Sequence, residues 1–184
     1  MLEINNLRFR WDEKSPWLLD GVNLRVAPGE IVGIMGHSGC GKSTLARLLS
    51  GHMPMQAGQM LLDEKPLPDR GVRPVQLVMQ HAELALNPRW RTGQSLCEGW
   101  QPDAPTRRSF GIRDEWLQRF PHELSGGEMQ RISIVRALVP QLRVLIADEL
   151  TTMHDPITQV QIWRALQEKS RERSFGLLAI SHDS

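Results

Sequence analysis

The sequence predicts an α/β protein, in which strands and helices alternate along the chain. A short apolar run at 31–35 precedes an amphipathic helical stretch. A continuous apolar run at 144–147 has the character of a parallel strand that is covered on both faces. A further buried strand is expected at 175–180, after a long helical stretch. Strands that alternate with helices in this way are typical of an α/β architecture.

Composition sets the limits of this prediction. The chain has 184 residues, 40% hydrophobic and 23% charged, which is ordinary for one globular domain and excludes disorder, collagen and a disulfide-stapled mini-protein. A net charge of +1 argues against nucleic acid as a partner. The apolar runs are too short to span a bilayer, no secretory signal is visible, and Cys40 and Cys97 suggest neither a metal site nor a redox pair. A cytosolic location is therefore expected.

The N-terminal third reads as strands followed by one helix. Val22, Leu24 and Val26 alternate with polar residues, which is the period of a half-buried strand, and the Pro-Gly pair at 28–29 marks a turn. A helix is expected over 44–49. The leucines expected on one face of that helix are Leu45, Leu48 and Leu49.

The middle of the chain is expected to be less regular. A small hairpin is expected at 59–67 around residues 63–65, and a strand at 77–79, whereas 81–123 shows little periodicity. Helical signals resume at Ser125. A helix is also expected to start at 155–156. The residues predicted to face inward on it are Ile157, Val160, Trp163 and Leu166.

The strongest chemical signal is a glycine-rich segment between the strand at 31–35 and the helix at 44–49. It matches the phosphate-binding pattern G-x-x-x-x-G-K-[ST]. Glycines let successive backbone amides point at phosphate oxygens, Lys42 supplies a charge to the β- and γ-phosphates, and Ser43 can ligate Mg²⁺. The alternative is a glycine-rich turn that happens to precede a helix. The predicted nucleotide-binding residues are Gly36, His37, Ser38, Gly39, Cys40, Gly41, Lys42, Ser43 and Thr44.

An acidic pair forms the second signal. Asp148 and Glu149 follow the apolar run at 144–147, at the strand end where α/β sheets place their ligands. Asp148 is predicted to hold Mg²⁺ through water, and Glu149 to polarise the attacking water. The alternative is a solvated strand end.

The third signal is the segment 124–131. Ser125 is expected to cap a helix, and Gly126 and Gly127 to leave its N-terminal amides available to a second anion. Two anion sites far apart in one sequence indicate ATP shared between two subunits. The alternative is a flexible Ser-Gly-Gly hinge before an ordinary helix.

The segment 124–131 closely resembles the signature motif of the ABC-transporter ATP-binding subunits, and the glycine-rich loop and the acidic strand resemble their Walker A and Walker B motifs. The resemblance covers almost the whole chain, with the motifs in the expected order. The resemblance implies a P-loop NTPase with a RecA-like core, an N-terminal antiparallel β subdomain and a short α-helical subdomain. It implies a single domain over 1–184, with the β subdomain and core at 1–80 and 137–184 and the helical part at 81–136. Members of the family continue beyond the position of Ser184, so a C-terminally truncated chain is expected.

Further residues fall at family positions. Gln80 resembles the Q-loop glutamine, which contacts Mg²⁺ or water and senses the membrane partner. Asp155 resembles the D-loop aspartate at the subunit interface, and His182 the switch histidine that contacts the γ-phosphate. Trp11 lies where an aromatic ring stacks on adenine, with Phe9 the weaker candidate.

The resemblance implies an ATP sandwich between two ABC ATPase subunits, identical or paralogous. Phosphates and Mg²⁺ held at 36–44 of one subunit meet Ser125–Gly127 of the other. Lys42, Gln80, Glu149 and His182 are the expected catalytic residues, and Ser43, Gln80 and Asp148 the expected metal ligands. The expected partners are a transmembrane permease and, indirectly, a solute-binding protein. The chain would then lie peripherally on the cytoplasmic face of the inner membrane.

A narrower resemblance is to the ATPases of peptide and nickel importers. The segment Asn87-Pro88-Arg89 and the residues 155–159 carry it. Departures from the family pattern are Leu150, where a proline is usual, and the atypical Met153 and His154. A nucleotide-gated ABC module of a soluble complex and a catalytically weak truncated subunit are the alternative functions.

Overall fold

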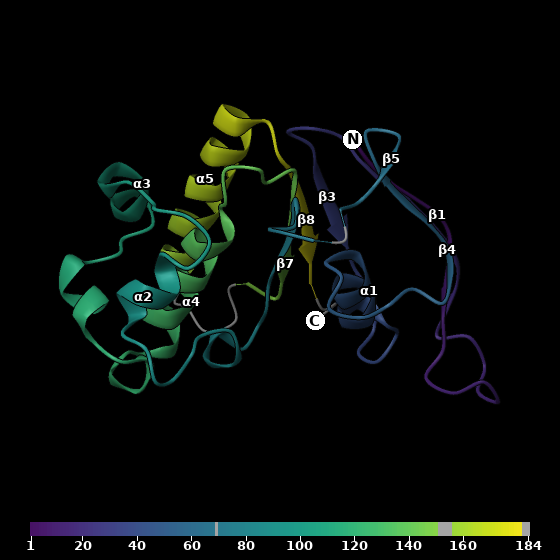
Figure 1. Cartoon of the computed structure of the whole chain (residues 1–184), viewed down its shortest axis with the longest axis horizontal. Helices are drawn as coiled ribbons and strands as arrows, with labels where there is room; N and C mark the ends of the chain where they lie inside the picture. The colour runs from purple at the N-terminus through teal and green to yellow at the C-terminus, as the bar shows by residue number, and fades with distance from the viewer. Residues whose placement is uncertain (69, 151–155, 182–184) are drawn as a thin grey trace.

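The computed structural model describes residues 1–68, 70–150 and 156–181, and their strands form two four-stranded sheets (Figure 1). One sheet is antiparallel, with the order β2-β1-β4-β5; its strands are β1 (Leu2–Phe9), β2 (Leu19–Val26), β4 (Ala57–Leu62) and β5 (Lys65–Pro66). The other is parallel, with the order β3-β8-β7-β6; its strands are β3 (Ile31–Ile34), β6 (Val75–Val78), β7 (Val144–Asp148) and β8 (Gly176–Ile180).

Three helices are longer than two turns, and the rest are short. The longer ones are α1 (Lys42–Leu49), α4 (Gly126–Ala137) and α5 (Pro156–Arg173). The short ones are η1 (Ala82–Leu84), α2 (Thr92–Leu96), α3 (Ala104–Ser109), η2 (Asp114–Gln118) and η3 (Pro121–Glu123). Among the described helices, none is both long enough and apolar enough to cross a membrane.

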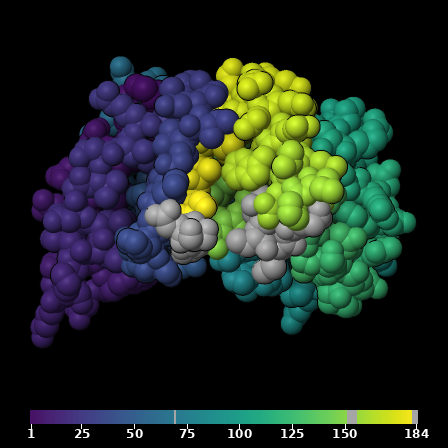
Figure 2. Space-filling view, turned by 180° about the vertical axis from the view of Figure 1, so that it is seen from behind, coloured from purple at the N-terminus to yellow at the C-terminus, as the bar shows by residue number. Residues whose placement is uncertain are grey.

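The parallel sheet is covered on both faces. In Figure 1, α4 and α5 lie on one side of it and α1 on the other, toward the antiparallel sheet. Strand β7 shows why: Val144 and Ile146 belong to the core that contains α1, whereas Leu145 and Ala147 belong to the core that contains α4 and α5. Seen from behind, α5 and β8 separate the N-terminal part from the short helices (Figure 2).

Several sequence predictions are confirmed. The α/β class holds, and Leu45, Leu48 and Leu49 are buried on α1. The predicted hairpin is formed by β4 and β5, and its two loop residues, Asp63 and Glu64, have φ of 50° and 63°. Positive φ at both loop positions matches the twist of the strands that a two-residue hairpin joins.

The prediction for the inward face of α5 was half wrong. Leu166 is buried and Trp163 packs half-buried against the same core, but Ile157 and Val160 are 72% and 50% exposed. A spacing of three residues falls short of the helical period of 3.6, so a run of such steps drifts around the helix. The observed inner face instead consists of Ile162, Ala165, Leu166 and Ser170.

Candidate functional site

Four segments, three of which hold predicted site residues, lie at the carboxyl-terminal edge of the parallel sheet. The glycine-rich loop follows β3, Gln80 follows β6, Glu149 follows β7, and Ser181 follows β8. The strand ends are level, since Ile180 pairs with both Ile34 and Asp148. The carboxyl ends of parallel strands are where open α/β sheets bind their ligands. The sheet therefore brings four segments together that are far apart in the sequence.

The loop between β3 and α1 depends on glycine at its last position. Gly41, the N-cap of α1, has φ of +101°, and a Cβ there would lie 3.0 Å from Cδ2 of Leu19. No side chain caps the first turn of α1. Backbone amides at a helix start that lack a side-chain acceptor are available to an anion.

Lys42 is held over this loop. Its side chain is buried, and Nζ donates to the carbonyl oxygens of Gly36 and His37 at 2.5 and 3.0 Å. The Sγ atom of Cys40 lies 3.9 Å from the same Nζ. The loop thus positions a full positive charge beside the positive end of the α1 dipole.

Trp11 is brought to the same loop. A cavity of about 260 Å³ is bounded by Trp11, Leu18 and the loop residues Gly39, Gly41, Lys42, Ser43 and Thr44. The Trp11 ring is 65% exposed and meets Phe9 edge to face, with 5.1 Å between the ring centroids. Phe9 itself is buried in the core. Of the two aromatic candidates, only Trp11 offers an accessible face beside the loop.

The acidic pair ends β7 with an unusual backbone. Oδ1 of Asp148 is buried, and it accepts no hydrogen bond among the residues that the structure describes. Glu149 has φ of +49°, and its amide donates to the carbonyl of Ile180 at 3.1 Å. A non-glycine residue in this region is strained, and such strain collects at functional sites. An unsatisfied buried carboxylate oxygen fits a hydrated Mg²⁺, a cation that prefers carboxylate and hydroxyl oxygens.

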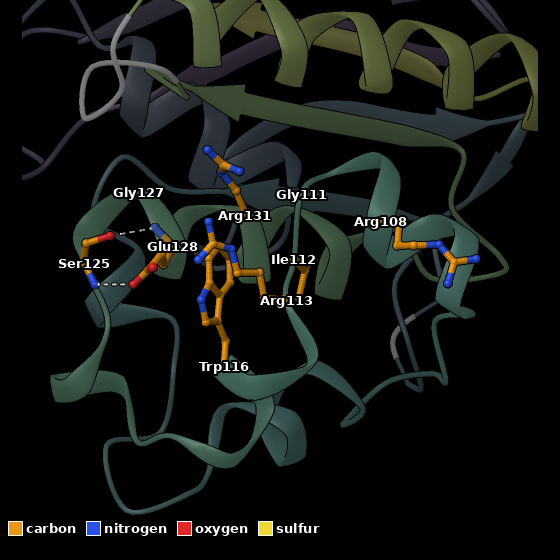
Figure 3. A pocket seen from close by; sticks show the side chains of 9 residues that line it. All are labelled: Arg108, Gly111, Ile112, Arg113, Trp116, Ser125, Gly127, Glu128 and Arg131. Carbon is orange, nitrogen blue, oxygen red and sulfur yellow. Dashed lines mark hydrogen bonds between the residues drawn. The ribbon is translucent and has the colours of Figure 1, made fainter.

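The segment at 124–131 forms a capped helix start. The Ser125 hydroxyl accepts from the Glu128 amide at 3.3 Å, and Oε2 of Glu128 accepts from the Ser125 amide at 2.9 Å. Ser125, Gly127 and Glu128 border a cavity of about 570 Å³ (Figure 3). None of the residues around this cavity also borders the cavity at Trp11. Within one chain the two predicted anion sites are therefore separate.

A residue that the sequence did not single out connects α4 to the Gln80 segment. Gln130 is 1% exposed, and its Nε2 donates to the carbonyl of Met79 at 3.1 Å. Gln80 itself is half-buried. A polar residue on the buried side of an amphipathic helix is the signal that could have identified Gln130, because such a group needs a hydrogen-bond partner.

Some predicted residues cannot be placed. Asp155, His182, Met153 and His154 lie outside the described residues. Leu150 is described, and it is buried in the core with α4 and α5.

The loop between β3 and α1, together with the acids at the end of β7 in the same parallel sheet, defines a P-loop nucleotide-binding protein. Residues 19–152 match the family model of the ABC transporter, and the chain therefore belongs to the ABC transporter family. The fold prediction of a P-loop NTPase with a RecA-like core and an antiparallel β subdomain is confirmed.

Two individual relatives show which members of the family this chain resembles. The chain is 34% identical over 214 residues to the oligopeptide transport ATP-binding protein OppF of Salmonella typhimurium, with all of this chain and 64% of the relative aligned. It is 38% identical over 191 residues to the nickel import ATP-binding protein NikE of Pseudomonas putida, with 92% of this chain and 70% of the relative aligned. The predicted similarity to peptide and nickel importers is thus confirmed.

Solved structures agree on the fold. A dimeric ATP-binding cassette in a post-hydrolysis state, bound to ADP and Pi, superposes with a TM-score of 0.82 at 23% identity. The superposition covers the whole of this chain and 88% of that one. At this identity the likeness describes the fold alone.

Proposed function

We propose that this protein binds and hydrolyses ATP as one subunit of an ATPase dimer, and that hydrolysis drives import of a solute through a membrane permease. The observation that carries the proposal is the buried Lys42 in a glycine-rich loop, at the sheet edge where Glu149 and Gln80 also lie. This arrangement supplies phosphate binding and a carboxylate for water from the same edge.

Nucleotide binding is assigned to the loop and to Trp11. Residues 36–44 would hold the phosphates through backbone amides, and Lys42 would exchange its contacts with the Gly36 and His37 carbonyls for phosphate oxygens. The exposed ring of Trp11 would stack on the base. Ser43, Asp148 and Gln80 would hold Mg²⁺, which neutralises charge on the β- and γ-phosphates.

Hydrolysis is assigned to Glu149. Its carboxylate would orient a water molecule and accept a proton from it as the water attacks the γ-phosphate. His182, by its resemblance to the switch histidine, would contact the γ-phosphate, and Lys42 would stabilise the developing charge. Catalysis would depend on positioning and charge rather than on a covalent intermediate.

The second subunit would complete the site. Ser125–Gly127 of one subunit would meet the phosphates bound at 36–44 of the other, and Asp155 would lie at their interface. The separation of the two cavities within one chain supports this sharing. The solved cassette of the same fold with ADP and Pi is itself dimeric.

Coupling to the membrane is assigned to the segment 81–136. We divide the chain into a β subdomain and core at 1–80 and 137–184 and a helical part at 81–136, with Gln80 at the junction. The helical part would contact the permease at the cytoplasmic face of the membrane, and a solute-binding protein would deliver the solute. The relatives OppF and NikE favour a peptide, nickel or a related small solute.

Replacement of Glu149 tests the enzymatic part. Glu149→Gln keeps the shape of the side chain but removes its proton-accepting charge, so ATP hydrolysis should fall by roughly a hundredfold or more while ATP binding persists. Phosphate release and equilibrium ATP binding measure the two quantities. Glu64→Gln, at the exposed β4–β5 turn, is the matched control. Turnover near that of the unaltered protein in Glu149→Gln would refute the assigned role.

Purification from membranes tests the coupling part. A tagged chain should co-purify with a polytopic membrane protein, and that partner should stimulate ATP hydrolysis. Recovery with soluble proteins alone would favour a nucleotide-gated module of a soluble complex. Nucleotide binding without hydrolysis, even with the permease present, would favour a catalytically weak subunit.

A further inference from the structure

Trp11 lies just beyond the end of the antiparallel sheet. Strand β1 ends at Phe9, and its last pair with β4 joins Arg8 to Ala57. In Figure 1 the chain that follows β1 extends past the ends of the strands. The Trp11 side chain is 65% exposed. An exposed ring outside regular structure can take several orientations unless other contacts hold its backbone, and stacking on a base requires one of them.

The side-chain amide of Gln56, the residue before β4, supplies such contacts. Its Oε1 accepts from the backbone amide of Arg10 at 2.9 Å, and its Nε2 donates to the carbonyl oxygen of the same residue at 2.8 Å. Two residues that face each other in an antiparallel ladder exchange the same pair of bonds. Gln56 therefore extends the contact between β1 and β4 past the end of the ladder, to the residue immediately before Trp11.

The rest of this segment is held from the side of β2. The amide of Leu18 donates to the carbonyl oxygen of Phe9 at 2.9 Å. The guanidinium carbon of Arg10 lies 4.5 Å from the centre of the Trp17 ring, a cation–π contact. Both contacts keep the segment 10–17 against the sheet. The bonds from Gln56 add a constraint on the backbone next to the Trp11 ring.

We propose that Gln56 is a positioning residue for the nucleobase, because it holds the Arg10 backbone and thereby the exposed face of Trp11. The inference rests on the proposed function, in which Trp11 stacks on the base. Trp11 borders the cavity at the glycine-rich loop, whereas Gln56 borders a neighbouring cavity of about 460 Å³ that Trp11 also borders. Gln56 therefore acts through the ring. A ring that is already oriented loses less conformational entropy when the base binds.

The first measurement needs no ligand. In the ¹⁵N-labelled full chain, the indole N–H signal of Trp11 is assigned by its loss in Trp11→Phe, and its heteronuclear NOE reports fast motion of the ring. Gln56→Ala should lower this NOE, because the backbone before Trp11 loses both bonds. Gln59→Ala removes the same kind of side chain from an exposed position on β4 and should leave it unchanged. An unchanged NOE in Gln56→Ala would overturn the inference.

The second measurement separates the base from the phosphates. Isothermal titration gives the Kd for ATP and for inorganic tripolyphosphate, which has no base. Gln56→Ala should raise the Kd for ATP by roughly threefold and leave the Kd for tripolyphosphate unchanged. Gln56→Glu keeps an acceptor for the Arg10 amide but loses the donor, so its Kd for ATP should lie between the two. Equal losses for both ligands would overturn the inference, since they indicate a disturbance of the loop itself.

A double variant tests whether Gln56 acts through the ring. Trp11→Ala should raise the Kd for ATP by roughly tenfold, which is typical of a lost stacking contact. In that background Gln56→Ala should change nothing further, whereas a full additional loss would overturn the inference.

The outcomes also separate this inference from the proposed function. A loss of ATP affinity in Trp11→Ala without one in Gln56→Ala would overturn the role of Gln56 alone. Normal ATP affinity in Trp11→Ala would overturn it together with the assignment of Trp11. Failure of the unaltered chain to bind either ligand would count against the proposed function, and the Trp11 NOE would still decide whether Gln56 holds the ring.

Discussion

Helices α1 and α4 both begin at glycine-rich segments, but their first turns are completed in different ways. At α4, Ser125 and Glu128 exchange hydrogen bonds with each other's backbone. At α1, the N-cap is Gly41 in a left-handed conformation, and no side chain accepts from the first turn. The positively charged Lys42 side chain instead folds over the loop that precedes the helix.

Because of this difference, the start of α4 contributes to the stability of the fold, whereas the start of α1 is suited to binding a ligand. The start of α4 is stabilised by its own side chains, so it can be presented to a partner without a ligand in place. At the start of α1 the backbone amides have no side-chain acceptor, and the buried side chain of Lys42 lies over the loop. Both features favour the binding of an anion there. Removal of the Lys42 side chain should therefore affect ligand binding most, and removal of the Ser125 cap should affect folding.

The largest effect is expected at Lys42. Lys42→Ala removes the charge that faces the phosphates, so ATP affinity should fall by roughly a hundredfold. Isothermal titration with ATP measures it. Lys65→Ala, at an exposed position on β5, loses the same charge elsewhere and should bind ATP normally. Equal ATP affinity in the two variants would contradict the claim that the start of α1 is the ligand-binding one of the two helix starts.

The next effect concerns backbone conformation. Gly41→Ala places a Cβ at φ of +101° and against Leu19, so the free energy of unfolding should fall by about 2 kcal/mol. Gly126→Ala, at the first position of α4, meets nothing within 4 Å and should be neutral or slightly stabilising. Urea denaturation measures both. A loss in Gly126→Ala as large as in Gly41→Ala would contradict the comparison.

A smaller effect is expected at the cap of α4. Ser125→Ala removes the acceptor for the Glu128 amide and should lower the free energy of unfolding by about 1 kcal/mol. Ser38→Ala, in the loop before α1, should change it by less than about 0.5 kcal/mol, because Ser38 is exposed and caps nothing. Identical denaturation midpoints for the two variants would be inconsistent with the capping geometry.

The smallest effect lies at the other end of α1. Burial, and then the charges of Arg47 and Arg73, hold the pKa of His52 below its ordinary value of 6.5. The unfolded chain therefore binds the proton more readily, and stability should decline as the pH falls below about 6.5. His52→Gln should flatten this part of the stability profile. An unchanged slope in that variant would show that other groups cause the decline.

Sequence reasoning identified most elements because their signals are local. The apolar run at 144–147, the glycine loop and the turn at 63–64 each depend on neighbouring residues. Which residues of α5 face inward is decided by how this long helix packs on the sheet. The prediction from three-residue spacing therefore placed Ile157 and Val160 on the inner face, although they are exposed. The short helices between 81 and 123 are held by tertiary contacts, so their sequence shows little period.

The site was predictable where a motif defines it. Residues 36–44 and the acids at the end of β7 lie at one sheet edge, as expected for the carboxyl ends of parallel strands. The hydrogen bond from Gln130 to Met79 was not predictable, because it joins segments that only the fold brings together. The roles of individual site residues stay predictions that the variants above address.

Strand β7 has a consequence for how the molecule comes apart. Its residues alternate between the two cores. A loss of packing in one core therefore removes support from a strand that the other core also needs. Local opening should therefore be confined to the edges of the molecule, and the amide hydrogens of β7 should exchange with solvent only when the whole protein unfolds. One central strand of five residues would make two cores behave as a single cooperative unit.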